Sequence, residues 1–493
     1  MRQSGILLHI SSLPGPEGIG SMGQNAYRFI DFLKASGMGI WQVLPVSPTG
    51  YGESPYQSFS CFAGNPLLID LHILRQEGLL KDADSYADKD PHSIDYMDLI
   101  AYKTGMLQRA FAQSRELVRG EVEAFRAAQT QWLEDYALFY AVKMHFGGGS
   151  WMDWPDEAIR KRQPQAMEKY RLALGQAIDF QVFVQYLFFR QWHQLKAYAN
   201  AAGIQLFGDM PIYVAMDSAD CWANPAAFRL DADRRPLLVA GVPPDYFSKD
   251  GQLWGNPLYN WKTLKKTGYS WWIDRLKAMG LLYDLIRVDH FIGFANYYAV
   301  RHTASTARYG GWRPGPGRHF FKVVRRELPQ LKIIAEDLGA VNPRVRKLLR
   351  YCGYPGMHVL SFAFSGDPDN PHLPRKCKKN AVYYTGTHDN DTLQGWWQTA
   401  GPHERTQARA VLGLTDDSQL NLAMISTVLS SQANRAVLPM QDVLGLDSRA
   451  RMNTPGTLGG NWQWRMPREA LSNFLAAWLR ELNTKYAREN THD

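Results

Sequence analysis

The sequence predicts an α/β fold, a (β/α)8 TIM barrel with mainly helical insertions between barrel strands and no C-terminal β-domain. Eight short apolar segments have the character of strands, and helical patterns separate most of them. Carboxylates follow several of these segments, as is typical of a barrel whose parallel strands all end at one face. A length of 493 residues suits one large barrel domain spanning residues 1–493.

The first two predicted strands flank a helix. The segment "GILLHI" (5–10) leads into "QNAYRFIDFLKASG" (24–37), whose apolar residues recur at helical spacing and whose Gly37 suits a helix C-terminus. A second strand, "IWQVLP" (40–45), follows at once. Strand, helix and strand in this order form a βαβ unit, which predicts parallel pairing.

Six further segments share this strand character. They lie at residues 204–210, 284–290, 332–338, 358–364, 381–387 and 435–441. Together with the first two they give eight, the number of strands that closes a (β/α) barrel.

The connections between these strands differ greatly in length. We interpret residues 71–200 as a mainly helical insertion and residues 211–283 as a loop-rich, aromatic one, both carried by the barrel. About 50 residues follow the eighth strand, and they suit a closing loop, "NTPGTLGGNWQWR", and a final helix. They leave no room for an appended β-sandwich.

The charge of the chain does not indicate a nucleic-acid partner. A net charge of +8 is modestly basic, and the densest run, "RKCKKN" (375–380), is short enough for a solvated loop. We therefore expect no nucleic-acid or membrane partner, and no obligatory protein partner.

The cysteines predict a reducing compartment. Cys61, Cys221, Cys352 and Cys377 lie far apart without a CxxC pair, which favours free thiols over disulfides or a zinc site. The N-terminal apolar run is too short for a signal peptide, and no stretch approaches the roughly 20 apolar residues of a membrane span. We expect a cytoplasmic protein, or one of the plastid stroma if a transit peptide was removed.

The aromatic residues indicate a carbohydrate ligand. Many of the 16 Trp and 24 Tyr lie beside Gly, Pro, Asn or Asp, as in "GYGESPYQSF" and "GGNWQW". Aromatic rings on loops are poor core residues but good stacking surfaces for the apolar faces of sugars.

Carboxylates at the strand ends predict an active site. Asp209 ends the third strand, Asp289 lies near the end of the fourth, Glu336 and Asp337 end the fifth, and Asp389 ends the seventh. In a parallel barrel these ends share one face. Clustered carboxylates repel one another and cost stability, so such a cluster favours chemistry over helix capping.

The residue types favour cleavage of a glycosidic bond. We find no HxH, HExxH or P-loop motif, and "DNDT" lacks the later ligands of a calcium loop, so no metal or cofactor is expected. Two carboxylates about 5–5.5 Å apart serve a retaining glycosidase as acid and nucleophile.

Neighbouring residues suggest which carboxylate is the nucleophile and which is the proton donor. Arg287 shares a strand face with Asp289, which favours an ionised nucleophile there. Burial near other carboxylates would raise the pKa of Glu336, as a proton donor requires. The two-residue period places Glu336 and Asp337 on opposite faces but does not say which points inward.

The chain resembles the 4-α-glucanotransferases (amylomaltases or disproportionating enzymes) of glycoside hydrolase family 77. The motifs that carry the resemblance follow in order along nearly the whole chain. They are "SSLPGPEGIG", "SPYQSFSCFAGNPLLIDL", "GDMPIYVAMDSADCWANP", "VAGVPPDYFSKDGQLWGNPLYNW", "RVDHFIGF", "IIAEDLG", "GTHDNDT" and "RMNTPGTLGGNWQWR".

The resemblance implies a retaining mechanism with Asp289 as nucleophile, Glu336 as acid/base and Asp389 as transition-state stabiliser. It also implies a set of sugar-binding residues. These are Tyr56, Asp209, Trp254, Arg287, His290, Phe362, His388, Asn461 and Trp462. Within "GTHDNDT", it leaves Asp391 and Thr392 the structural role of a turn and helix start.

The expected substrates are an α-1,4-glucan donor and a glucose or maltooligosaccharide acceptor. The carboxylates alone do not choose between transfer and hydrolysis, but an aromatic acceptor site that excludes water favours transfer. The loops "DYFSKDGQLWGNPLY" and "NTPGTLGGNWQWR" are candidates for that site. An α-amylase-type hydrolase and a non-catalytic glucan-binding protein are the alternatives.

Overall fold

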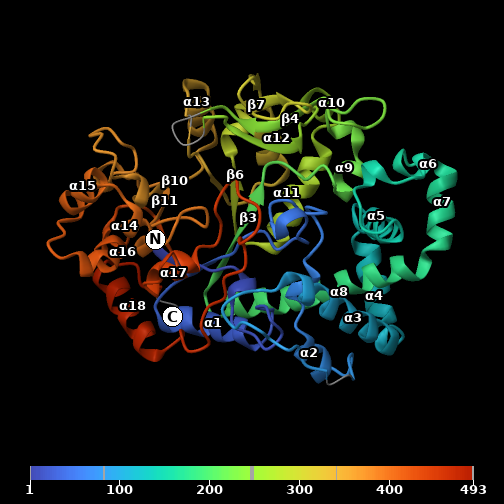
Figure 1. Ribbon diagram of the computed structural model, residues 1–493, viewed down its shortest axis with the longest axis horizontal. Coiled ribbons are helices and arrows are strands. Elements are labelled where there is room, and N and C mark those ends of the chain that lie inside the picture. Colours follow the sequence, from blue (N-terminus) through green and yellow to red (C-terminus); the bar gives the residue numbers. More distant parts are fainter. Residues whose placement is uncertain (1, 82–83, 245–248, 340, 491–493) are drawn as a thin grey trace.

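Eight parallel strands form a barrel at the centre of the molecule, as a computed structural model shows (Figure 1). The structure describes residues 2–81, 84–244, 249–339 and 341–490. The strands in barrel order are β10 (Gly356–Val359), β11 (Ala381–Tyr384), β12 (Arg435–Pro439), β1 (Gln3–Leu7), β2 (Ile40–Gln42), β3 (Gln205–Pro211), β6 (Leu285–Asp289) and β9 (Ile333–Ala335). Each overlaps one of the eight predicted segments, so the predicted (β/α)8 TIM barrel is confirmed.

The barrel interior is filled by apolar side chains from alternate strand positions. Buried residues such as Phe207, Leu285, Ile334 and Tyr384 form one cluster inside the barrel. Because side chains alternate between faces along a strand, residues two positions further on point inward as well. This places Asp209, Arg287 and Glu336 above the apolar interior.

The barrel has a seam between β9 and β10. Among the described residues these two strands share no ladder, and the backbone N–H of Ala335 donates to the carbonyl of Pro355 at 2.8 Å. Asp337 strengthens the seam, because its Oδ1 accepts from the N–H of Met357 at 2.8 Å. The side chain of Asp337 therefore lies in the seam, whereas that of Glu336 lies at the barrel mouth.

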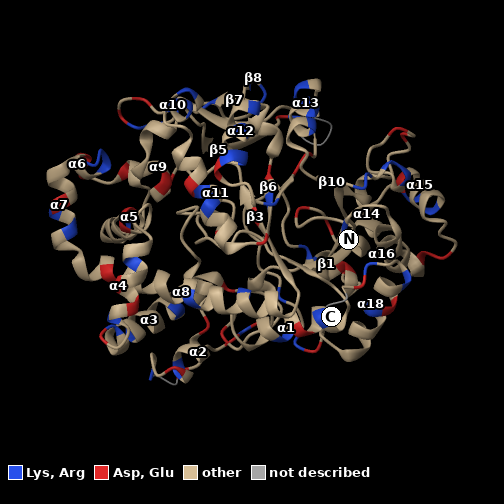
Figure 2. Ribbon diagram, turned by 180° about the vertical axis from the view of Figure 1, so that it is seen from behind, with Lys and Arg blue, Asp and Glu red and all other residues tan. Residues whose placement is uncertain are grey.

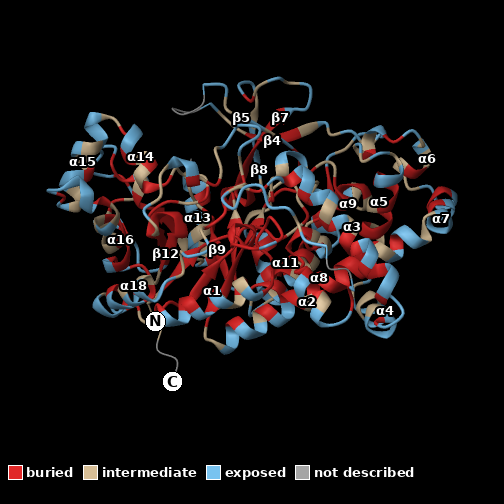
Figure 3. Ribbon diagram, turned by 60° about the horizontal axis from the view of Figure 1, so that its bottom comes forward, coloured by how far each residue is buried: buried red, intermediate tan, exposed pale blue. Residues whose placement is uncertain are grey.

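Helices surround the barrel and cover the outer faces of its strands. Those packed against the barrel or against one another around it are α1 (Gln24–Ala35), α8 (Gly175–Ala201), α11 (Ser270–Leu282), α12 (Gly317–Glu327), α13 (Pro343–Cys352), α16 (Leu420–Ser430) and α18 (Asn473–Lys485). Figure 3 shows the strands buried and the outward faces of the helices exposed. Within the described residues, no strand follows β12.

Two further groups of helices flank the barrel on opposite sides (Figure 1). One comprises α2 (Leu71–Gln76), α3 (Tyr96–Ser114), α4 (Arg119–Ala128), α5 (Leu133–His145), α6 (Glu157–Arg160) and α7 (Pro164–Ala173). The other comprises α14 (Leu393–Thr399), α15 (Pro402–Leu412) and α17 (Met440–Val443). The region expected to be helical, 71–200, contains the first group. Its last helix, α8, packs on β3 as a helix of the barrel itself.

The segment expected to be loop-rich, 211–283, holds regular structure that the sequence did not reveal. Strands β4 (Leu238–Val242) and β5 (Gln252–Pro257) pair with β7 (Asn296–Arg301) and β8 (Gly311–Pro314) in a four-stranded antiparallel sheet, ordered β5-β4-β7-β8. Helices α9 (Ala219–Ala223) and α10 (Trp261–Lys266) lie in the same segment. The sequence analysis thus did not predict the small sheet that this segment contributes to.

Basic side chains gather on two neighbouring helices, α12 and α13 (Figure 2). Both helices are described in full, and Glu327 is the one acidic residue in them. Their exposed basic residues are Arg318, Lys322, Arg325, Arg326, Arg344, Arg346, Lys347 and Arg350. Part of the positive charge of the protein is thus concentrated on these two helices.

Membrane-spanning character is weak in the described residues. No single helix there is long and apolar enough to cross a membrane. Helices α7 and α8 together have the length and apolar composition of a membrane span, but a bend of 80° separates them.

All four cysteines are free thiols.

Candidate active site

Three charged side chains meet where β3 and β6 lie side by side at the barrel mouth. The ladder pairs Asp209 with Arg287, so the two side chains are neighbours on the inner face. Arg287 donates from Nη1 to Oδ2 of Asp209 at 2.6 Å, and its Nη2 lies 2.8 Å from Oδ1 of Asp289. One buried guanidinium therefore compensates two carboxylates. The Tyr56 hydroxyl also donates to Oδ2 of Asp209, at 2.8 Å.

The Glu336 carboxylate lies one residue beyond the end of β9 and is buried. Its Oε2 accepts from the backbone N–H of His290 at 2.7 Å, and its Oε1 accepts from the N–H of Leu338 at 2.7 Å. Because His290 directly follows Asp289, the first of these bonds brings Glu336 beside the end of β6. The structure thus places Asp289 and Glu336 together on one rim.

The environment of Glu336 favours its protonated form. Burial and the nearby charge of Asp289 raise the pKa of Glu336 to about 8. Arg287 and the two backbone N–H donors oppose this shift but do not cancel it. A carboxyl group with such a pKa holds a proton at neutral pH and can donate it.

His290 has an unusual backbone conformation that serves this arrangement. It adopts left-handed angles, φ 50° and ψ 45°, which few residues other than glycine tolerate. The turn it makes between β6 and the 3-10 helix η6 (Phe291–Phe294) aims its N–H at Glu336. Burial lowers the pKa of its imidazole to about 4, so the ring is neutral.

Asp389 belongs to the loop that follows β11. Its side chain is 45% exposed, whereas that of Asp289 is 31% exposed and that of Asp209 is fully buried. Oδ1 of Asp389 accepts from Nδ2 of Asn453 at 2.6 Å and lies 3.4 Å from Nε2 of His388. The loop ends as the sequence indicated, because the Thr392 side chain caps α14 by accepting from the N–H of Gly395.

Aromatic rings form a wall beside this loop. The Tyr56 ring stacks on His388 with centroids 5.1 Å apart, and Trp462 lies 5.7 Å from Tyr56. Across the mouth, Trp254 meets the His290 ring edge-on at 4.9 Å. Aromatic rings thus adjoin the charged cluster, since Tyr56 bonds Asp209 and Trp254 contacts the residue after Asp289, as a site for sugar rings requires.

Two predicted sugar-binding residues lie further from the charged cluster. Phe362, in the 3-10 helix η7 (Leu360–Phe362), is 43% exposed and has the His372 ring 5.5 Å away. Asn461 supports its own loop, because its Oδ1 accepts from the N–H of Thr454 at 2.9 Å. Of the predicted acceptor loop 245–259, residues 245–248 lie outside the described residues.

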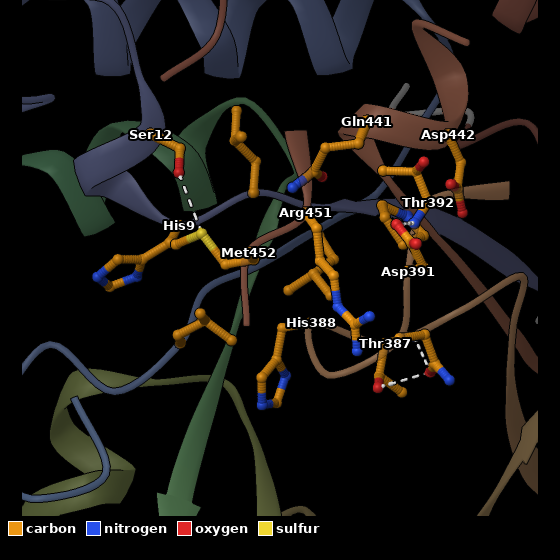
Figure 4. Close-up of a pocket in the computed structure, with 15 residues that line it drawn as sticks. His9, Ser12, Thr387, His388, Asp391, Thr392, Gln441, Asp442, Arg451 and Met452 are labelled. Carbon is orange, nitrogen blue, oxygen red and sulfur yellow. Dashed lines mark hydrogen bonds between the residues drawn. The ribbon is translucent and has the colours of Figure 1, made fainter. Parts of the chain in front are cut away.

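A pocket lies behind His388, between the ends of β1, β11 and β12 (Figure 4). His9, His388, Asp391, Asp442 and Arg451 are among the residues that line it. Burial raises the pKa of Asp442 to about 6.

In the parts of the chain that the structure describes, we find no group of three His, Cys, Asp or Glu residues arranged to hold a metal ion.

Residues 8–471 match the 4-alpha-glucanotransferase family, glycoside hydrolase family 77. The chain belongs to this family. It is 45% identical over 502 residues to a 4-alpha-glucanotransferase of Synechocystis sp., covering 100% of this chain and 99% of that protein. It is 46% identical over 492 residues to the one of Thermus thermophilus, covering 98% of each.

A solved structure of similar fold supports the same assignment. An amylomaltase from Streptococcus agalactiae in complex with acarbose superposes with a TM-score of 0.97 at 40% identity, covering 99% of this chain and 100% of that one. The predicted family, and with it the prediction of a transferase enzyme, is confirmed. The roles of individual residues in this 4-alpha-glucanotransferase family member remain predictions.

The sequence did not reveal the residues that hold the Asp389 loop. Asn453 and Arg451 lie in the quoted motif "RMNTPGTLGGNWQWR", and Asp442 follows the eighth strand, but nothing in their spacing connects them with Asp389. Polar residues just after a barrel strand are a signal that could have drawn attention to Asp442.

Proposed function

We propose that this family member transfers segments of α-1,4-glucan to the 4-hydroxyl of glucose or of a maltooligosaccharide. The mechanism is a retaining double displacement through a covalent glycosyl-enzyme. One observation carries this proposal above the others. A buried Glu336, with its pKa raised to about 8, lies beside an Asp289 that is paired with Arg287.

In the first step, a carboxylate oxygen of Asp289 attacks the anomeric carbon of the donor. The bond from that carbon to the glycosidic oxygen breaks, and Glu336 gives its proton to the departing 4-oxygen. Arg287 supports the ionised form of Asp289, because it lies 2.8 Å from that carboxylate. The products are a shortened glucan and a glycosyl ester on Asp289.

In the second step, Glu336 acts as the base. It takes the proton of an acceptor 4-hydroxyl, whose oxygen attacks the anomeric carbon as the ester bond to Asp289 breaks. Two inversions restore the α configuration. Asp389 accepts hydroxyl hydrogen bonds from the donor ring while that ring flattens toward an oxocarbenium ion.

Transfer competes with hydrolysis because water can take the place of the acceptor. The rings of Tyr56, Trp254 and Trp462 support a site that positions an acceptor sugar and displaces water. We therefore expect hydrolysis to be a slow side reaction. The acarbose complex of the similar amylomaltase supports a glucan-like ligand in this fold.

The test is incubation of the purified protein with maltotriose. We expect glucose together with maltopentaose and longer products, while the total number of reducing ends stays constant, because transfer conserves glycosidic bonds. Thin-layer chromatography and a reducing-end assay measure both quantities. Products that only shorten, with steadily rising reducing ends, would show a hydrolase instead.

We also propose that the protein acts in the cytoplasm, or in the plastid stroma if a transit peptide was removed. Its four free thiols support a reducing compartment. Labelling of the unfolded protein with a thiol reagent directly after isolation checks this, and a protein isolated with disulfides would contradict it.

A further inference from the structure

Asp389 lies further from its barrel strand than the other two carboxylates do. Asp289 ends β6 and Glu336 lies one residue beyond β9, whereas Asp389 stands five residues beyond the end of β11. Within the loop, Oδ1 of Asn390 accepts from the N–H of Thr387 at 2.8 Å and from its hydroxyl at 2.9 Å. A half-exposed carboxylate on such a loop needs external contacts to hold one orientation.

Those contacts come from the segment 448–453, which follows β12 on the neighbouring side of the barrel mouth. The N–H of Asn453 donates to the carbonyl of His388 at 3.1 Å, and Nη2 of Arg451 donates to the carbonyl of Asp389 at 2.8 Å. The hydroxyl of Ser448 donates to Oδ2 of Asp391 at 2.8 Å. Three acceptors along the loop, from residues 388, 389 and 391, are thus held by one segment.

The segment is itself braced as a unit. Arg451 donates from Nε to the carbonyl of Asn453 at 2.8 Å while its other nitrogen holds Asp389, so one planar guanidinium bridges the two residues. Figure 4 shows the Arg451 side chain extending alongside Thr387 and His388.

Asp442 fixes the two ends of the same loop. Its Oδ2 accepts from the Thr385 hydroxyl at 2.6 Å, just after β11, and its Oδ1 accepts from the N–H of Leu393 at 2.9 Å, where α14 begins. The carboxylate is buried, and its position between both ends limits how far the loop can move.

The side chain of Asn453 makes the contact that matters for chemistry. Its Nδ2 donates to Oδ1 of Asp389 at 2.6 Å, and Nε2 of His388 lies 3.4 Å from the same oxygen. Among the described residues, no hydrogen bond reaches Oδ2 of Asp389. One carboxylate oxygen is therefore held and the other is free for a ligand.

We infer that Asn453 is a positioning residue for the glycosyl transfer. It anchors Oδ1 of Asp389 so that Oδ2 meets the hydroxyls of the donor ring as that ring distorts. This inference rests on the proposed function, because it assigns Asn453 a role only through Asp389. A contact needed chiefly in the transition state affects kcat more than KM.

The test compares Asn453→Ala, Asn453→Asp and the control Asn380→Ala. Asn380 also donates a side-chain amide hydrogen bond, in its case to the backbone carbonyl of Gly353 at 3.0 Å, on the exposed loop before β11. With maltotriose as donor, we expect Asn453→Ala to lower kcat roughly 10- to 100-fold with KM changed less than about threefold. Asn453→Asp, nearly isosteric but without an amide donor, should lose at least as much, whereas Asn380→Ala keeps normal kinetics.

Three further measurements separate positioning from a structural role. The loss in Asn453→Ala should persist with α-maltosyl fluoride, whose leaving group needs no proton, because Asp389 acts on the ring. In the Asp389→Asn background, Asn453→Ala should cause little additional loss. Thermal unfolding of Asn453→Ala should match that of Asn380→Ala within about 2 °C, as expected for a change of a few tenths of a kcal/mol.

Each outcome decides a different claim. Normal kcat in Asn453→Ala or Asn453→Asp, or losses that add fully in the double variant, would overturn the inference. Products that only shorten from maltotriose would instead overturn the proposed function. Transfer by the unchanged protein, together with coupled losses in Asp389→Asn and Asn453→Ala, supports both.

Discussion

The two sides of the barrel mouth hold their carboxylates by different means. On the side of β3, β6 and β9, the carboxylates of Asp209 and Glu336 are buried, and one guanidinium, Arg287, pairs with both Asp209 and Asp289. On the side of β11, Asp389 is half-exposed, its carboxylate is held by the side-chain amide of Asn453, and its backbone carbonyl is held by Arg451. The first arrangement controls protonation, since charges interact strongly where water is excluded. The second controls orientation, since hydrogen bonds fix direction.

The comparison predicts that the largest loss of activity follows removal of Asp289, the proposed nucleophile. Asp289→Ala should lower kcat by roughly three to five orders of magnitude, because it removes the carboxylate proposed to attack the anomeric carbon. Maltotriose turnover measures the loss, and retention on a glucan affinity gel checks that binding survives. Activity near that of the unchanged protein would refute the assignment.

A smaller loss is expected for Glu336→Gln, and it depends on the leaving group. A raised pKa keeps Glu336 protonated at neutral pH, so the rate with maltotriose should fall as pH rises through about 8. Glu336→Gln should lower kcat roughly 10²- to 10⁴-fold at pH 7 and abolish that decline.

The donor α-maltosyl fluoride separates the two steps for this variant. Fluoride departs without a proton, so Glu336→Gln should release one rapid equivalent of fluoride and then turn over slowly for lack of a base. A variant that still loses activity with rising pH, or that shows no fluoride burst, would show that another group supplies the proton.

The last comparison concerns the free energy of unfolding, for which substitutions on the two sides of the barrel mouth should differ. Arg287→Met leaves two carboxylates without their cation, one of them fully buried, and should cost roughly 3–5 kcal/mol of unfolding free energy at pH 7. Ser448→Ala removes one exposed hydrogen bond to Asp391 on the other side and should cost about 0.5 kcal/mol. Urea unfolding measures both, and equal losses would remove the distinction.

Most of the fold could be predicted from the sequence because barrel strands are short apolar runs at regular intervals. Their ends could not, since 358–364 and 435–441 continue from strand into helix without a break in apolar character. The antiparallel sheet was missed for a related reason. Segments such as Leu238–Val242 and Gly311–Pro314 are four or five residues long and contain Gly or Pro, which weakens any strand signal.

Part of the candidate site could also be predicted from the sequence. Carboxylates at strand ends pointed to the barrel mouth, but the choice between Glu336 and Asp337 was not possible. Both faces of a barrel strand are buried, so Ile333 and Ile334 look alike in sequence, although only Ile334 lies in the interior cluster. The contacts of Asn453 and Arg451 with Asp389 join residues about 60 positions apart, and no local pattern encodes them.

The left-handed turn at His290 bears on how the enzyme could be redesigned. The donor that it offers to Glu336 belongs to the main chain, so exchanging the side chain leaves that donor in place. Asn, Asp and Gly tolerate such angles, whereas proline would delete the N–H and β-branched residues would resist the turn. A small library at this one position should therefore vary substrate preference while the proton-transfer machinery stays intact.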